Sequence, residues 1–228
     1  MARRGWTLAA GMVVLPFALA ACSGGGHAAV AGSASAAKAA AVEGITPAML
    51  KNALLTRVNG VAAAGLASSG KYASVARAAG GVQVTPKACA VAAAQGFDLA
   101  VLAGAAAAAV TFRVAANAVS EVLIASSDKP AAAALAGRIP AGCNRYEEKV
   151  AGKPVTFGVR EQAVTGIGKQ AEALNAQAAG VAADNLWSLI YRGKGFVGTV
   201  TVIGPNASEK AVQELGQQAY AFAAKTLS

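Results

Sequence analysis

Histidine, the side chain used most often for proton transfer near neutral pH, occurs once in the 228 residues, as His27. It lies in an alanine- and glycine-rich segment, where it predicts neither a metal ligand nor a catalytic base. A Ser-His-Asp or Cys-His site is therefore excluded elsewhere in the chain. The acidic pair Glu147-Glu148 falls in an expected strand, and neighbours in a strand point to opposite faces, so the two cannot converge as a catalytic dyad. We predict a protein without enzymatic activity, metal or cofactor.

Cys22 indicates a different chemistry. Arg3-Arg4 and an apolar stretch over residues 8–20 precede it, as in a secretory signal. The segment that ends at Cys22, Leu-Ala-Ala-Cys, resembles the lipobox of bacterial lipoproteins. This resemblance implies cleavage between Ala21 and Cys22 and a thioether-linked diacylglycerol on the thiol, so that palmitate would be incorporated. The alternative is an ordinary signal with a chance cysteine, and the paired arginines leave Sec and twin-arginine export both open.

The chain divides into three expected parts. Residues 1–21 are the signal peptide, 22–44 a lipidated flexible tether, and 45–228 a single extracytoplasmic domain. The tether is mostly alanine, glycine and serine, which bury too little surface to offset the entropy lost on ordering. We expect the protein on the extracytoplasmic face of the cell membrane, and its composition suggests an actinobacterium.

The composition looks membrane-like but has another explanation. Hydrophobic residues make up 55% and the mean hydropathy is +0.47. Alanine contributes 62 residues of this, and no apolar stretch reaches the roughly 20 residues that a spanning helix needs. The membrane connection therefore depends on Cys22.

The elements predict an α+β fold with an antiparallel sheet of about five strands, helices on one side and a C-terminal helix. Thr46 and Pro47 are typical of a helix start, and Asn206 is expected to cap the last helix, whose apolar face includes Phe222. We expect 58–81 to be mainly loop, with or without a short helix, and 99–109 could be helix or strand. Further helices are predicted at 86–94 and 130–138, and strands at 110–114, 121–124, 142–150, 155–160, 186–192 and 196–203.

Cys89 and Cys143 are the cysteines left after lipidation of Cys22. Two cysteines in an exported domain favour a disulfide, and two buried free thiols are the alternative.

A few side chains near the predicted hairpin at 186–203 could contact a ligand: Trp187, Tyr191, Arg192 and Lys194. Aromatic residues in strands more often belong to the core. With strict alternation, Trp187 and Tyr191 share one face of the sheet.

The charge of +9 falls to +7 once the signal is removed. The basic residues are scattered and lack aromatic interleaving, which argues against nucleic-acid binding. Anionic lipid headgroups or cell-wall polymers are the expected partners, alongside the membrane reached through Cys22, and the alternative is a charged surface that only keeps the protein soluble. The oligomeric state is not indicated.

The lipobox, the tether and several short motifs together resemble actinobacterial cell-envelope lipoproteins. These motifs are Thr-Pro-Ala-Met-Leu at 46–50, Pro86-x-x-Cys89, Cys143-Asn-Arg-Tyr146, and the hairpin that begins at Trp187. The domain is similar to the extracellular sensor domain of mycobacterial receptor serine/threonine kinase H. That resemblance implies an antiparallel sheet with flanking helices, a cleft and a ligand-binding role without known chemistry.

We therefore expect a membrane-anchored, non-enzymatic domain that binds a ligand or partner. The alternative is a lipid or glycolipid carrier, which would need an apolar cavity of several hundred cubic ångströms.

Overall fold

The computed structural model describes residues 44–78, 84–90, 102–136, 139–150, 153–179 and 185–228. The predicted signal peptide and nearly all of the tether, including Ala21 and Cys22, lie outside these residues. The described residues belong to one compact unit of the chain.

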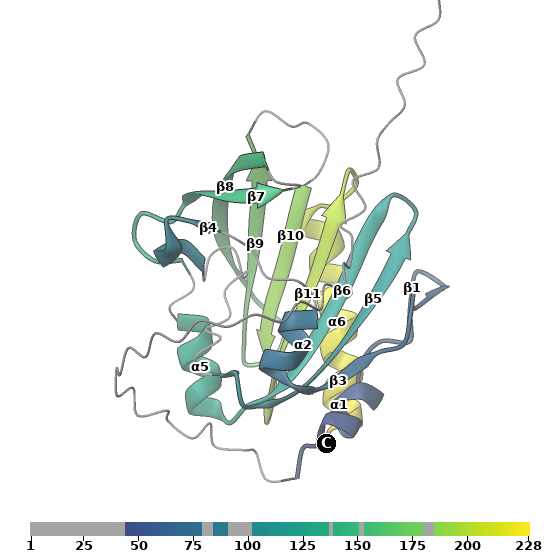
Figure 1. Ribbon diagram of the computed structural model, residues 1–228. Coiled ribbons are helices and arrows are strands. Elements are labelled where there is room, and N and C mark those ends of the chain that lie inside the picture. The colour runs from purple at the N-terminus through teal and green to yellow at the C-terminus, as the bar shows by residue number, and fades with distance from the viewer. Residues whose placement is uncertain (1–43, 79–83, 91–101, 137–138, 151–152, 180–184) are drawn as a thin grey trace, which may run out of the picture. The chain divides into compact units, whose positions relative to one another are not determined.

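One antiparallel sheet of nine strands dominates this part of the chain (Figure 1). The sheet is larger than the five or so strands expected, and a separate two-stranded hairpin, β1–β2, accompanies it. The order across the sheet is β3-β5-β6-β11-β10-β9-β8-β7-β4. The bounds are β1 Arg57–Val58, β2 Val61–Ala62, β3 Ser68–Lys71, β4 Val84–Thr85, β5 Ala106–Val114, β6 Asn117–Ala125, β7 Arg145–Val150, β8 Lys153–Val164, β9 Gln170–Ala178, β10 Asn185–Arg192 and β11 Phe196–Gly204.

Helices lie on both faces of the sheet, and not on one side as predicted. α1 and α6 cover one face, here called the α6 face, whereas α2 and α5 lie over the opposite α2 face (Figure 1). Each face carries its own buried cluster, because side chains along a strand alternate between the faces. The bounds are α1 Pro47–Asn52, α2 Tyr72–Ala78, the 3-10 helix η1 Lys87–Cys89, α5 Asp128–Ala136 and α6 Glu209–Thr226.

The predicted hairpin is the centre of the sheet. β10 and β11 pair along their whole length, from Asn185 beside Gly204 to Arg192 beside Val197. Leu189 and Tyr191 are completely buried on the α6 face, and Ile190 is completely buried on the α2 face. The alternation expected from the sequence is therefore confirmed.

Several strands were not expected, and their composition explains why. β9 has the sequence Gln-Ala-Glu-Ala-Leu-Asn-Ala-Gln-Ala, whose residues favour helix in isolation. Pairing with β8 and β10 on both sides overrides that preference. The alanines 106–109, which begin β5, favour helix in the same way. The region 58–81, expected to be mainly loop, contains β2, β3 and the helix α2.

Of the two helix N-caps expected from the sequence, the structure confirms one and corrects the other. Thr46 Oγ1 accepts a hydrogen bond from the Met49 N–H at 3.2 Å, so the predicted cap of α1 is confirmed. α6 is capped by Ser208, which accepts from the Ala211 N–H, and not by Asn206. Phe222 is 37% exposed, because the buried stripe of α6 continues from Ala219 to Ala223. Of the helix expected at 86–94, the described part is η1 and Ala90.

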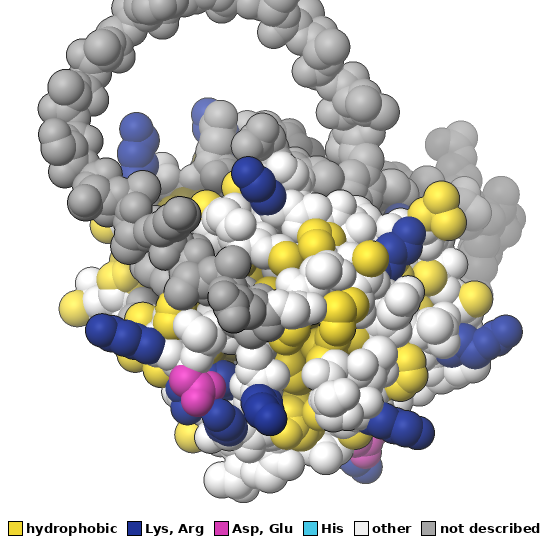
Figure 2. Space-filling view, turned by 90° about the horizontal axis from the view of Figure 1, so that it is seen from below, with side chains coloured by type: hydrophobic (Ala, Val, Ile, Leu, Met, Phe, Trp, Pro, Cys, Tyr) yellow, Lys and Arg dark blue, Asp and Glu magenta, His cyan; other side chains and the backbone are white. Residues whose placement is uncertain are grey.

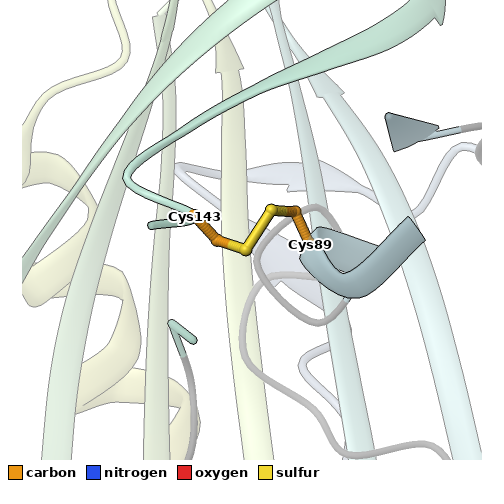
Figure 3. Close-up of a disulfide and its surroundings, with 2 residues drawn as sticks. All are labelled: Cys89 and Cys143. Atoms are coloured by element: carbon orange, nitrogen blue, oxygen red, sulfur yellow. A yellow bond between two sulfur atoms is a disulfide. The ribbon is translucent and has the colours of Figure 1, made fainter. Parts of the chain in front are cut away.

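Cys89 and Cys143 form the predicted disulfide on the α2 face (Figure 3). Cys89 ends η1 and Cys143 lies just before β7, and the bond spans 54 residues of sequence. Both cysteines are buried. The bond therefore fixes the edge of the sheet where β4 pairs with β7.

Three aromatic rings join the central hairpin to α6 and require two glycines. Tyr191, Phe196 and Tyr220 pack with ring centroids 5.9 to 6.4 Å apart. A Cβ added to Gly198 would lie 2.3 Å from the Tyr191 ring, and one added to Gly193 would lie 2.3 Å from the Phe196 ring. The rings thus occupy the space that any larger residue would need.

Replacement of Gly198 by alanine should lower the free energy of unfolding by about 1–3 kcal/mol, because the methyl group must displace the buried Tyr191 ring. Gly158→Ala in β8 is the matched control, since no atom lies within 4 Å of its added Cβ. Chemical denaturation of both variants measures the difference. Equal stability of the two variants would contradict the packing described.

Candidate functional site

The structure separates the four residues that the sequence offered as ligand contacts. Trp187 packs against the α6-face cluster, and Tyr191 there has 0% of its surface exposed. Arg192 ends β10, and the exposed Lys194 lies in the turn before β11. Tyr191 therefore cannot contact a ligand from this position, and the four side chains do not form one site.

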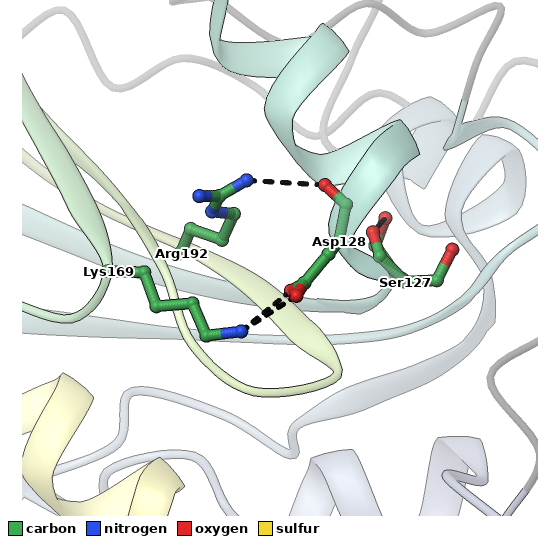
Figure 4. Close-up of polar contacts among 5 residues, drawn as sticks. Ser127, Asp128, Lys169 and Arg192 are labelled. Carbon is green, nitrogen blue, oxygen red and sulfur yellow. Dashed lines mark hydrogen bonds and ion pairs between the residues drawn. The ribbon is translucent and has the colours of Figure 1, made fainter.

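Arg192 belongs to a polar cluster where α5 begins (Figure 4). Lys169 Nζ binds both carboxylate oxygens of Asp128, at 2.8 and 3.0 Å. Arg192 Nη1 donates to the Asp128 carbonyl oxygen at 3.2 Å. The hydrogen bond from Lys169 is the main cause that lowers the pKa of Asp128, so this carboxylate is ionised and already paired. The cluster fastens α5 to the sheet end and leaves a surplus of positive charge.

The α2 face carries a feature that was not predicted, a row of hydroxyl side chains across four adjacent strands. Thr111 in β5 lies beside Ser120 in β6, Ser120 beside Thr201 in β11, and Thr201 beside Ser188 in β10. Directly paired residues have their Cβ atoms about 4.5–5.5 Å apart on one face. Ser188 Oγ and Thr201 Oγ1 are hydrogen-bonded at 2.9 Å. We call these four residues the hydroxyl row.

The hydroxyl row runs from solvent into the interior. Thr111 is exposed, Ser120 is half-buried, Thr201 is 6% exposed and Ser188 is fully buried. Arg113 lies on the same face two residues beyond Thr111 and is also exposed. The outer end therefore presents hydroxyl groups and one guanidinium to solvent.

Thr199 lies next to the hydroxyl row and has an unused hydrogen-bonding group. It is 7% exposed, and its Oγ1 has no partner among the described residues. A buried hydroxyl without a partner destabilises a fold by about 1–3 kcal/mol. A water or a polar ligand that reached Thr199 could satisfy this hydroxyl group.

The α6 face buries a different polar pair. Glu121 is 1% exposed, and its Oε2 accepts a hydrogen bond from the Leu55 N–H at 2.7 Å. Its Oε1 and the Tyr191 hydroxyl are both buried without a partner among the described residues. Burial raises the pKa of Glu121 to about 7, against a smaller lowering by the Leu55 bond. Burial also raises the pKa of Tyr191, and the charge on Glu121 raises it further.

A cavity on the α6 face, between α6 and the sheet, measures about 100 Å³. Its lining mixes apolar residues such as Val119 and Leu215 with the polar Asn117, Glu214 and Gln218. This volume is a fraction of what a lipid carrier needs.

Three further features were checked among the described residues: a metal site, a pair of converging carboxylates and a membrane-spanning helix. No group of three His, Cys, Asp or Glu side chains there could hold a metal ion. Glu147 and Glu148 point to opposite faces of β7, as expected. No helix among the described residues is long and apolar enough to cross a bilayer.

Sequence reasoning missed the hydroxyl row and Glu121 for different reasons. The row exists only through the register of four strands, one of which, β5, was partly unassigned. Glu121 stands in a predicted strand, and its parity with Leu123 would have placed it in the core. A carboxylate at a core position was the signal available.

Comparisons with known proteins identify no family for the sequence. No protein-family model and no curated protein matches it. Among solved structures, the fold is similar to the extracellular domain of PknH from Mycobacterium tuberculosis, with a TM-score of 0.46 and 14% identity over 64% of this chain and 78% of that chain. It is also similar to an Rv0999 ortholog from Mycobacterium smegmatis, with a TM-score of 0.35 and 16% identity over 64% of this chain and 77% of that chain. The first of these two structures is the extracellular domain to which the sequence showed a resemblance.

Glu121 should make the stability of the protein depend on pH. The pKa of Glu121 is about 7 in the folded protein and 4.5 for an unperturbed glutamate, so unfolding at a pH between these two values releases a proton. The contribution of Glu121 is therefore most favourable below pH 4.5 and falls by about 3 kcal/mol by pH 7 and above. Glu121→Gln should remove this dependence, so that the variant gains stability relative to wild type by about 2–3 kcal/mol between pH 5 and pH 8.

Chemical denaturation at several pH values checks this expectation. Glu147→Gln is the control, since Glu147 is exposed in β7. A difference between wild type and Glu121→Gln that stays constant with pH would show that Glu121 is ionised throughout.

Proposed function

We propose that the protein is a lipid-anchored, extracytoplasmic, non-enzymatic domain that binds a polyhydroxylated ligand, such as a cell-wall glycan, at the outer end of the hydroxyl row. The observation that carries the proposal is the register that aligns Thr111, Ser120, Thr201 and Ser188 on the α2 face. Hydroxyl groups both donate and accept hydrogen bonds, which suits them to ligands rich in hydroxyl groups.

The surroundings of the hydroxyl row support a ligand of this class. The exposed Arg113 adds a donor that could bind a carboxylate or phosphate on the same ligand. Thr199 supplies a buried hydroxyl next to the row with hydrogen-bonding capacity to spare. The one histidine, His27, belongs to the expected tether, and the carboxylates of β7 diverge, so binding without turnover is the better hypothesis.

The carrier hypothesis is weaker on the observed interior. Val200 and Val202 are buried at 1% and 4% exposure, and Ile190 has none of its surface exposed. The interior of the central strands is therefore occupied by side chains. The cavity of about 100 Å³ is too small for an acyl chain and a headgroup together.

The membrane anchor follows from the lipobox resemblance at Cys22. Two acyl chains on one cysteine give stable attachment, because each buried methylene contributes about 0.8 kcal/mol. The domain would then work on the outer face of the membrane, where the disulfide between Cys89 and Cys143 is stable.

Radiolabelled palmitate fed to cells that express the chain should label the wild-type protein and leave Cys22→Ala unlabelled, because the thiol is the acylation site. Gel fluorography of the immunoprecipitated protein measures the label. Cys143→Ala is the control and should keep it, since Cys143 is expected to carry no lipid. Label that persists in Cys22→Ala would disprove the anchor.

Ligand binding can be tested by titration calorimetry with soluble peptidoglycan fragments. Thr111→Val and Ser120→Ala should each weaken binding by about five- to ten-fold, the effect of about one hydrogen bond. Ser69→Ala in β3 is the matched control. Ser69 is exposed and, since it pairs with Ala108, it lies on the α6 face and not on the face of the hydroxyl row. Equal effects of all three substitutions, or no binding by wild type, would reject this site.

A further inference from the structure

We infer that one end of the sheet is a surface that docks onto an anionic membrane, an inference that rests on the proposed lipid anchor at Cys22. This basal surface is formed by α1, the last turns of α6, the start of α5, residues 165–169 and the turn 192–195 (Figure 1). It is distinct from the outer end of the hydroxyl row, which lies on the α2 face.

The elements of the basal surface meet at one end of the strands. β8 and β10 end there and β9 and β11 begin there, as the pairing of Gln170 with Arg192 shows. Gly168 lies against both Arg192 and the Tyr220 ring, which brings the late turns of α6 to the same end. The described chain also begins there, since α1 lies beside the C-terminus (Figure 1). Gly44, the first described residue after the proposed anchor, therefore lies at this end of the domain.

Basic residues dominate the elements of the basal surface. The acidic residue among them is Asp128, and Lys169 already binds it at 2.8 Å. Glu172 lies further along β9 and accepts a hydrogen bond from Gln170. The other basic residues of this end are Lys51, Lys71, Lys129, Arg192, Lys194 and Lys225.

Apolar side chains lie among these basic residues. Met49 in α1 is 39% exposed and Phe222 in α6 is 37% exposed. Figure 2, a view of this end, shows hydrophobic side chains gathered in the centre with lysine and arginine side chains around them. Cationic rims bind anionic headgroups, and a central apolar patch enters the boundary with the acyl chains.

A short tether to the membrane would raise the effective concentration of the basal surface at the bilayer, so that even a weak affinity for lipid would keep it bound. The sequence predicts a tether of 21 residues, Ser23 to Glu43, between Cys22 and Gly44; a random coil of that length would have an end-to-end distance of about 25 Å. An anchored domain is then held near the bilayer at an effective concentration of about a millimolar or more. The membrane is therefore the occupant that this surface meets most often.

Vesicle co-sedimentation tests the proposal on the mature chain from residue 22 with Cys22→Ser, which has no acyl chain. The chain should bind vesicles of phosphatidylcholine with phosphatidylglycerol, release them as salt rises, and not bind phosphatidylcholine alone. Lys194→Glu with Lys225→Glu should lower the partition coefficient at least about twenty-fold, since each lysine near an anionic surface contributes about five-fold. Lys149→Glu with Lys153→Glu is the matched control, because both lysines are exposed near the β7–β8 turn at the opposite end.

The apolar patch has its own pair of variants. Phe222→Ser should also weaken vesicle binding, whereas Leu66→Ser should not, although Leu66 is 97% exposed, because it lies in the connection between β2 and β3. Circular dichroism of each variant establishes that the fold is retained. The proposal would be overturned if replacement of the control lysines Lys149 and Lys153 reduced vesicle binding equally. It would also be overturned if the chain bound soluble anionic polysaccharide but not vesicles. Because the assayed chain carries no lipid and no glycan, these results do not depend on whether the anchor or the hydroxyl row is correct.

Discussion

The packing of Tyr191 across Gly198 is the constraint on which the rest of this structure depends. The ring fills the place of a side chain in the neighbouring strand and also contacts the Tyr220 ring of α6. Phe196 and Tyr220 extend the same contact to the turn and to the helix. The Tyr191 hydroxyl is buried in this core, and so is the Glu121 carboxyl group that accepts from the Leu55 N–H, so the apolar layer contains polar groups.

This packing also decides which chemistry each surface can present. Rings and aliphatic side chains close the α6 face, and alternation then leaves the hydroxyl groups of the same central strands on the α2 face. The ends of those strands gather the turns, where glycine and lysine are concentrated. The pattern along β10 and β11 thus yields an α6 face closed by rings and aliphatic side chains, an α2 face that combines a second apolar cluster with the hydroxyl row, and a basic end.

The sequence was a good guide where a signal is local and a poor guide where it depends on pairing. The hairpin at 186–203 was predictable because β-branched and aromatic residues flank a Gly-Lys-Gly turn, and Thr46 with Pro47 marked α1 for similar reasons. β9 could not be predicted, because alanine, glutamine and glutamate favour a helix until two neighbouring strands fix them. The hydroxyl row depends on four registers at once, which no single segment of sequence contains.

The place where the chain enters the domain has a mechanical consequence. If the outer part of the domain is bound to a rigid polymer while its leading segment is held at the bilayer, tension enters through α1, a helix of six residues. The Leu55–Glu121 hydrogen bond and the burial of Leu50 and Leu54 resist that pull, whereas the sheet itself is loaded only afterwards. Under such tension α1 would detach from the domain before any strand separates from the sheet.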